Sequence, residues 1–292
     1  MFADRLLAGK RILVTGGGTG LGRVMAEQYL QLGAELYICG RRPAVLEEAA
    51  AEMTDTHGGK VTPKTLDIRD AAAVDATVES IFADGPLTGL VNNAAGNFIS
   101  PTKDLSVNGF NAISSIVFNG TFYMTHAVGK RWVEQEQSGS VISILTTWIW
   151  NGSPYTVPSA MSKSAINIMT KSLAAEWGQY GIRLNAIAPG PFPTKGAWDR
   201  LRPDSDGGES DYSRTIPMGR VGEMPELANL ATFLMADGCD YLTGQTIAID
   251  GGSHLAGGGN FWNLSQLSDD DWQSIRETIK SSNEKDKAQR AQ

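Results

Sequence analysis

The sequence contains few of the residues that build disulfide frameworks and metal centres. Of its 292 residues, two are cysteines and three are histidines. Cys39 and Cys239 fit no metal-site spacing, and the histidines are scattered along the chain. We therefore expect neither a disulfide framework nor a metal site. A chain so poor in cysteine is typical of a reducing compartment, and we predict a cytoplasmic location.

Long apolar runs and an excess of positive charge are also missing. No run approaches the ~20 apolar residues of a membrane span, and we expect no signal peptide, because residues 1–5 lead into no long apolar stretch. Lys and Arg number 25 against 32 Asp and Glu, which gives a net charge of −7. An acidic surface argues against nucleic acid or an anionic membrane as the main partner. We expect a soluble protein that binds neither.

The chain instead alternates short apolar segments with longer segments of helical period. The predicted strands are residues 11–15, 35–40, 61–67, 89–94, 140–145, 182–188 and 245–250. Helices are predicted up to residue 33, then at 43–56, up to 83, at 107–136, 159–178, 225–235 and 269–281. Strands that are apolar throughout and separated by helices predict a parallel sheet covered on both faces. We expect one α/β domain over residues 1–292, with a doubly wound sheet of about seven strands.

Two pieces are irregular. Residues 190–217 are rich in Gly, Pro and Asp, and loops of this length are usually lids or disordered. A C-terminal extension, residues 258–292, holds the last predicted helix, with Ser268 as its N-cap. We expect the last ten residues to be solvated and disordered.

The first predicted strand runs directly into the glycine-rich turn TGGGTGLG, residues 15–22. Glycine lets the backbone turn tightly and approach a pyrophosphate, while N–H groups at the helix start meet its negative charge. A tight turn alone would also explain the glycines, but its place at the first strand–helix junction favours a dinucleotide. The predicted contacts in this turn are Gly16, Gly18, Thr19, Gly20, Leu21 and Gly22.

The ends of the next strands indicate which cofactor binds. Arg41 and Arg42 stand where an NAD site has an acidic residue, and Arg41 can pair with the 2′-phosphate of NADP. Both arginines could instead be solvated, but we favour NADP. Asp67 either accepts from the adenine amino group or caps the following helix. Small residues after the fourth strand let the nicotinamide ribose lie against the backbone. Further cofactor contacts are predicted at Ile68, Asn93, Ala94, Ala95, Gly96, Lys163, Pro189, Gly190, Pro191, Phe192 and Thr194.

Together, the glycine turn, residues 92–96, Lys163 and residues 189–190 resemble the short-chain dehydrogenase/reductase family over residues 8–255. The resemblance implies a Rossmann-like sheet, a nicotinamide cofactor and a homotetramer or homodimer. It also implies a catalytic Tyr-x-x-x-Lys pair with a nearby hydroxyl and an Asn. Here Ser159 replaces that tyrosine and Val117 the asparagine, whereas Thr146 supplies the hydroxyl and Lys163 remains to hold the ribose.

The missing tyrosine has a chemical interpretation. When a conjugated enoyl or dienoyl thioester is reduced, hydride goes to the far end of the conjugated system and charge develops on the thioester oxygen. The proton donor or oxyanion donor must then lie farther out. A catalytically inactive protein would lack the tyrosine too, so this loss alone does not decide the function.

The segments 92–106, 157–159, 171–191 and 194–198 resemble the 2,4-dienoyl-CoA reductases, which carry Ser-x-x-x-Lys. This resemblance implies that Asn97 holds the substrate carbonyl and that Phe98 and Ser106 line the acyl-CoA site. It also makes the arginines 41, 69 and 200 candidates for CoA phosphate contacts, although each could equally be a solvated arginine.

Trp148 stands where part of that group has a catalytic tyrosine, and an indole N–H cannot supply a proton. Tyr155 is the nearest alternative donor, or else one aromatic wall of the acyl site together with Trp148 and Trp150; a water or Asn97 would otherwise serve. The leading hypothesis is an NADPH-dependent reductase of enoyl or 2,4-dienoyl thioesters, with CoA favoured. The alternatives are a carbonyl or alcohol oxidoreductase that uses Tyr155 and a non-catalytic NADP-binding scaffold.

Overall fold

The computed structural model describes residues 1–194, 215–256, 264 and 267–290. Most of the predicted lid loop, including Arg200, lies outside the described residues. The chain forms two compact units, Met1–His254 and Leu255–Gln292. All seven strands belong to the first unit, which therefore carries the predicted sheet.

The sheet has seven parallel strands in the order β3-β2-β1-β4-β5-β6-β7, which confirms the doubly wound fold. The strands are β1 (Arg11–Thr15), β2 (Glu35–Gly40), β3 (Val61–Thr65), β4 (Gly89–Asn92), β5 (Gly139–Ile144), β6 (Ile182–Pro189) and β7 (Thr246–Ile249). The chain moves outward from β1 to β3 and then returns to β4, beside β1. The strand order reverses there, and ligands of open α/β sheets bind at the carboxyl ends of such strands.

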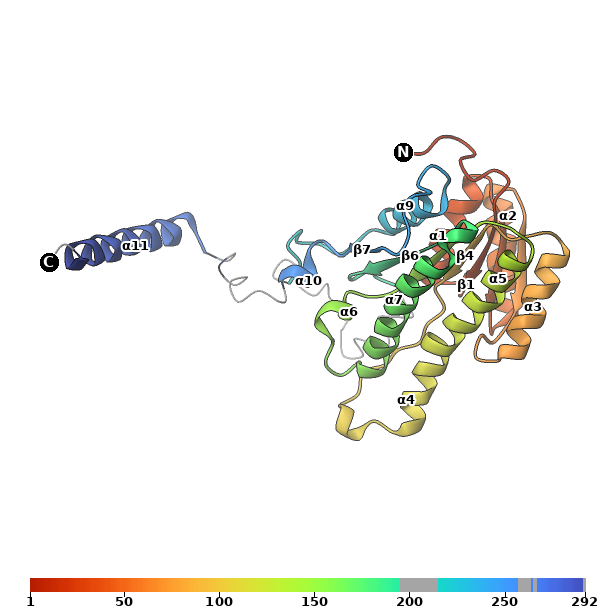
Figure 1. Cartoon of the computed structure of the whole chain (residues 1–292), viewed down its shortest axis with the longest axis horizontal. Helices are drawn as coiled ribbons and strands as arrows, with labels where there is room; N and C mark the ends of the chain where they lie inside the picture. The colour runs from red at the N-terminus through yellow and green to blue at the C-terminus, as the bar shows by residue number, and fades with distance from the viewer. Residues whose placement is uncertain (195–214, 257–263, 265–266, 291–292) are drawn as a thin grey trace. The chain divides into compact units, whose positions relative to one another are not determined.

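Helices cover both faces of the sheet (Figure 1). One face carries α1 (Gly20–Gln31), α2 (Pro43–His57) and α9 (Met224–Met235), and the other carries α3 (Ala71–Ala83), α5 (Thr121–Glu134) and α7 (Val157–Trp177). The shorter helical pieces are η1 (Thr102–Asp104), α4 (Val107–Ser114), the π-helical η2 (Ser115–Gly120), α6 (Trp148–Asn151), η3 (Gly178–Tyr180) and α10 (Ser253–Ala256).

Alternate residues of each central strand enter opposite cores. In β1, Ile12 and Val14 pack with α1, α2 and α9, whereas Leu13 packs with α3 and α5. This follows from the two-residue period of a strand, which points successive side chains to opposite faces. A continuously apolar strand is therefore buried on both sides.

Several boundaries differ from the sequence-based prediction. Strand β3 ends at Thr65, so Asp67 lies in the loop after it. Strand β4 ends at Asn92, so Asn93 lies in the loop after β4. The helix predicted at residues 107–136 is interrupted by the π-helical η2, and α7 begins two residues early. Proline fits the first turn of α7 because that turn has no intrahelical partner for its N–H groups.

The second unit contains α11 (Asp269–Arg290). Ser268 caps this helix as predicted, since its hydroxyl accepts from the backbone N–H of Asp271 at 3.2 Å. The prediction that the last ten residues are disordered was wrong for most of them, because the helix continues to Arg290. Three consecutive aspartates in its first turn favour the helix through its dipole.

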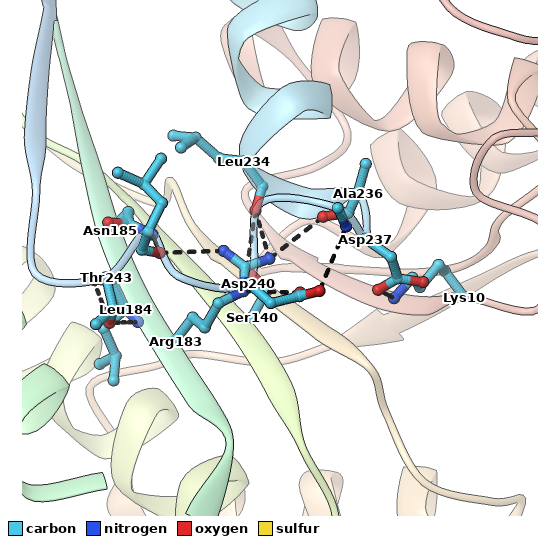
Figure 2. A network of polar contacts seen from close by, with 12 residues as sticks. Lys10, Ser140, Arg183, Leu184, Asn185, Leu234, Ala236, Asp237, Asp240 and Thr243 are labelled. Carbon is cyan, nitrogen blue, oxygen red and sulfur yellow. Dashed lines mark hydrogen bonds and ion pairs between the residues drawn. The ribbon is translucent and has the colours of Figure 1, made fainter. Parts of the chain in front are cut away.

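At the amino ends of the strands, a polar network fastens α9 to the sheet (Figure 2). The guanidinium of Arg183, on β6, donates to the carbonyl oxygens of Leu234 at 3.0 Å, Ala236 at 3.3 Å and Leu242 at 3.4 Å. The hydroxyl of Ser140, on β5, also donates to the Leu234 carbonyl, at 3.1 Å. These carbonyls end α9 or follow it, where a helix leaves acceptors without intrahelical partners. The network therefore caps the helix from two strands.

Candidate active site

The hydroxyl of Thr15 joins the carboxyl ends of β1 and β4. It accepts from the backbone N–H groups of Asn93 and Ala94, both at 2.9 Å, and donates to the Val91 carbonyl at 3.3 Å. The Asn93 side-chain amide donates back to the Thr15 carbonyl at 3.0 Å. These bonds fix the glycine-rich turn against the loop after β4.

The glycines of the turn are required for different reasons. Gly16 and Gly20 have φ values of +66° and +56°, in the left-handed region that favours glycine. At Gly22 a side chain would collide with the Gly16 carbonyl and with the amide of Asn93. Helix α1 begins at Gly20, so its N-terminal dipole end lies at this cradle. The backbone arrangement fits a dinucleotide pyrophosphate.

A cavity of about 450 Å³ opens beside the turn and is called here the cofactor cavity. The predicted cofactor residues among its lining are Gly16, Gly18, Thr19, Leu21, Arg41, Asp67, Ile68, Asn93, Ala94, Ala95 and Thr194. Sequence reasoning missed the apolar walls Cys39, Val45, Leu46, Leu66 and Ile116, which carry no motif. Arg42, the neighbour of Arg41, also lines this cavity.

Asp67 is held by Arg69 at the edge of the cofactor cavity. The Arg69 Nε lies 2.9 and 3.0 Å from the two carboxylate oxygens, and its Nη2 lies 2.5 Å from Oδ2. This bonding lowers the pKa of Asp67, and the charge of Arg41 lowers it further. The helix-capping alternative for Asp67 was wrong, because Asp70 caps α3 by accepting from Ala72 and Ala73. Arg69 is not among the described residues that line either cavity, and its predicted CoA contact stays a prediction.

A second cavity of about 700 Å³, called here the substrate cavity, adjoins the first and shares Leu21 and Thr194 with it. It lies at the carboxyl ends of β5 and β6. The predicted residues among its lining are Thr146, Trp148, Tyr155, Pro189, Gly190, Pro191, Phe192 and Thr194. The hydroxyls of Thr146 and Tyr155, both predicted to be catalytic, therefore share this cavity with the loop after β6.

Lys163 lies behind the wall of the substrate cavity. It is 6% exposed, and its ammonium donates to the backbone carbonyl of Ile144, a residue that lines the cavity. Burial lowers the pKa of Lys163 to about 8. Ser159, one helical turn earlier on α7, is also buried. Ser159 and Lys163 share a face of the helix, as their spacing predicts.

Tyr155 lies at the rim of the substrate cavity and is 61% exposed. Its φ of +64° is unusual for an aromatic residue. The backbone N–H of Ser100 donates to the Tyr155 carbonyl at 2.9 Å, which joins the loop before α7 to the loop after β4. Trp148 shares the cavity wall, as predicted. Trp150 instead stacks on His254, with ring centroids 4.6 Å apart.

The three residues predicted from the loop after β4 have other contacts. Asn97 accepts from the backbone N–H of Phe98 at 2.9 Å, and Phe98 packs against the apolar cluster that contains Ile113. Ser106 caps α4 by accepting from Gly109 at 3.0 Å. The described lining of the substrate cavity includes their neighbours Ile99, Ser100 and Pro101 instead. The substrate roles of Asn97, Phe98 and Ser106 stay predictions.

The family model described as Enoyl-(Acyl carrier protein) reductase matches residues 16–254. This chain belongs to the short-chain dehydrogenase/reductase family. It is an oxidoreductase, and the family fold binds a nicotinamide dinucleotide.

Relatives from Caenorhabditis elegans and from bacteria match 84% or more of the chain. It is 41% identical to a probable 2,4-dienoyl-CoA reductase 3, (3E)-enoyl-CoA-producing, of Caenorhabditis elegans, over 97% of this chain and 94% of the relative. It is 40% identical to a probable 2,4-dienoyl-CoA reductase, (2E)-enoyl-CoA-producing, of Bacillus subtilis, over 84% of this chain and 97% of the relative. A short chain dehydrogenase from Bacillus anthracis with a known crystal structure is 39% identical in sequence. The two structures superpose with a TM-score of 0.76, over 87% of this chain and 98% of the dehydrogenase.

Two further findings concern membranes and metals. Within the described residues, no helix combines the length and the apolar character needed to cross a membrane. The same residues bring together no group of three or more His, Cys, Asp or Glu side chains that could hold a metal ion. The cytoplasmic location stays a prediction.

Proposed function

We propose that this protein is an NADPH-dependent reductase of conjugated enoyl or 2,4-dienoyl thioesters, with acyl-CoA as the substrate. The main support is the apolar substrate cavity that adjoins the cofactor cavity. Its walls include Ile99, Leu145, Trp148 and Phe192, which suit an acyl chain better than a polar sugar or hydroxy acid. The names of the relatives from C. elegans and B. subtilis support the same substrate class.

NADPH is the proposed cofactor because two arginines, Arg41 and Arg42, line the cofactor cavity directly after β2. A guanidinium can donate two parallel hydrogen bonds to a phosphate, and the charge attraction strengthens them. Both side chains are exposed, so they are free to reorient toward a 2′-phosphate. An NAD site would have an acidic residue at this position.

When bound, the reduced cofactor supplies a hydride. Lys163 would hold the nicotinamide ribose: an ammonium has three N–H donors, and the bond to Ile144 uses one of them. Thr146 and Tyr155 present hydroxyl groups from the wall of the substrate cavity. Because charge develops on the thioester oxygen, a donor at the rim is better placed than one in the slot of Ser159. We propose Tyr155 as this donor.

We also propose that the protein self-associates as a homotetramer or homodimer. Large apolar side chains are exposed on neighbouring helices: Phe118 on η2, Phe122 on α5, and Met161 and Ile168 on α7. Burying such side chains between copies removes apolar surface from water. Light scattering after gel filtration measures the oligomeric state, and Phe122→Glu should lower it; a monomeric wild-type protein would contradict the proposal.

The activity is tested by mixing protein, NADPH and a 2,4-dienoyl-CoA and following the loss of reduced cofactor by absorbance. Turnover is expected, and identification of the product double bond would show which of the two named product types forms. Turnover of simple ketones but not of the thioester would support a carbonyl reductase instead. Tight NADPH binding without turnover of either substrate would identify a non-catalytic scaffold.

A further inference from the structure

Three charged residues, Arg41, Asp67 and Arg69, follow the carboxyl ends of β2 and β3 and alternate in sign. Strands β2 and β3 pair in register up to Gly40 and Thr65, and the Leu66 N–H donates to the Gly40 carbonyl at 2.8 Å. Arg41 and Asp67 therefore leave neighbouring strands at nearly the same level, and both line the cavity. Arg69 follows two residues later and pairs with Asp67.

The position of Asp67 creates an electrostatic problem for a phosphorylated cofactor. Asp67 is the acidic residue among the described lining of the cofactor cavity. A carboxylate repels a nearby phosphate, and the repulsion is stronger where protein displaces water. An aspartate is ionised at neutral pH, and the bonds from Arg69 lower the pKa of Asp67 further. The negative charge must therefore be compensated rather than removed by protonation.

Arg69 provides that compensation with a defined geometry. Its guanidinium contacts both oxygens of Asp67, and its backbone N–H donates to Oδ1 at 3.1 Å. Contacts to both oxygens cancel the charge and also fix the orientation of the carboxylate. The side chains of Arg69 and Asp67 are 43% and 32% exposed, so the pair contributes little to folding stability. Its effect should appear in cofactor binding instead.

We infer that Arg69 is a positioning residue that neutralises Asp67 beside the 2′-phosphate site and so helps set the preference for NADPH over NADH. This inference rests on the proposed NADPH preference. Without Arg69, the uncompensated carboxylate repels the doubly charged 2′-phosphate. NADH lacks that phosphate, so its binding depends less on Arg69.

The test measures dissociation constants of NADPH and NADH for the full chain. In Arg69→Gln, NADPH binding should weaken by about tenfold more than NADH binding at low salt, and the difference should shrink at high salt. Arg69→Lys should retain most of the preference. Asp67→Asn in the Arg69→Gln background should restore the NADPH to NADH ratio, because no carboxylate is left to compensate.

Lys60→Gln is the matched control. Lys60 precedes β3 at the opposite end of the sheet, and its removal changes the net charge by the same amount. The control should leave both dissociation constants unchanged. Equal losses of NADPH and NADH in Arg69→Gln, or no rescue by Asp67→Asn, would overturn the inference and leave the proposed cofactor intact. A wild-type protein without NADPH preference would overturn both.

Discussion

The two edges of the sheet use arginine in opposite ways. At the amino edge, Arg183 is buried and its guanidinium is bonded to three backbone carbonyls (Figure 2). At the carboxyl edge, Arg41 is exposed beside a cavity of about 450 Å³. Arginine therefore stabilises the fold at the amino edge and is available to a ligand at the carboxyl edge.

The direction of the chain explains this difference. In a parallel sheet, each helix starts near the carboxyl edge and ends near the amino edge. The free N–H groups at the start of α1 therefore favour an anion at the carboxyl edge. The free carbonyls at the end of α9 need donors at the amino edge, and Arg183 supplies them. Variants at the two edges should therefore differ in whether they change ligand binding or stability.

The largest expected effect is a loss of activity without a loss of stability. Lys163→Met removes the buried ammonium and should lower kcat/KM by about a hundredfold or more. Stability should stay equal or rise, because burying a charge disfavours folding. Steady-state kinetics and urea unfolding measure the two effects. A variant that keeps activity within about threefold of wild type would refute a catalytic-site role for Lys163.

The pH dependence gives a second test of Lys163. Burial lowers its pKa to about 8, so the free enzyme loses this charge as the pH rises above 8. The value of kcat/KM for NADPH should then fall by about tenfold per pH unit. The free energy of unfolding should instead rise with pH between pH 8 and the pKa of an unfolded lysine. In that range the unfolded chain binds a proton at Lys163 that the folded protein does not. A flat kcat/KM profile from pH 7 to 10 would argue against an essential charge.

The amino edge should respond in stability and not in cofactor binding. Arg183→Met removes the donor to the Ala236 carbonyl and leaves the Leu234 carbonyl with Ser140 alone, so it should lower the free energy of unfolding by about 3 kcal/mol. The dissociation constant of NADPH should be unchanged under conditions where the variant is folded. Lys60→Met, at an exposed site, is the control and should unfold like the wild type. Weakened NADPH binding in folded Arg183→Met would break the proposed division.

Arg41→Ala should affect cofactor binding and leave stability nearly unchanged. We expect NADPH to bind about thirtyfold more weakly, with a much smaller change for NADH, because a charged bidentate contact to the phosphate is lost. Titration followed by cofactor fluorescence measures both constants. Equal losses for the two cofactors would reject phosphate recognition by Arg41.

The smallest effect is expected at the rim of the substrate cavity. Tyr155→Phe keeps the aromatic wall and removes the hydroxyl, so kcat should fall by roughly tenfold if the hydroxyl donates the proton. NADPH affinity should not change, since Tyr155 lines the substrate cavity and not the cofactor cavity. An unchanged kcat would reject Tyr155 as the proton donor.

Much of the fold and the place of the cofactor cavity followed from local patterns. The apolar runs located all seven strands, and the glycine turn located the cofactor cavity, because both depend on neighbouring residues. The choice between Asp67 and Asp70 as the cap of α3 was not predictable, since both precede the helix and both can accept from backbone N–H groups. Only the geometry of the turn, with Arg69 folded back, separates their roles.

The sequence by itself determined the doubly wound sheet, the dinucleotide turn and the shared helix face of Ser159 and Lys163. Each is set by spacing along the chain, through the periods of strand and helix. Tertiary structure alone decided that residues 99–101 wall the substrate cavity, that Trp150 stacks on His254, and that Arg183 caps α9. These contacts join residues about 50 to 100 positions apart, and their distances depend on how the packed elements meet.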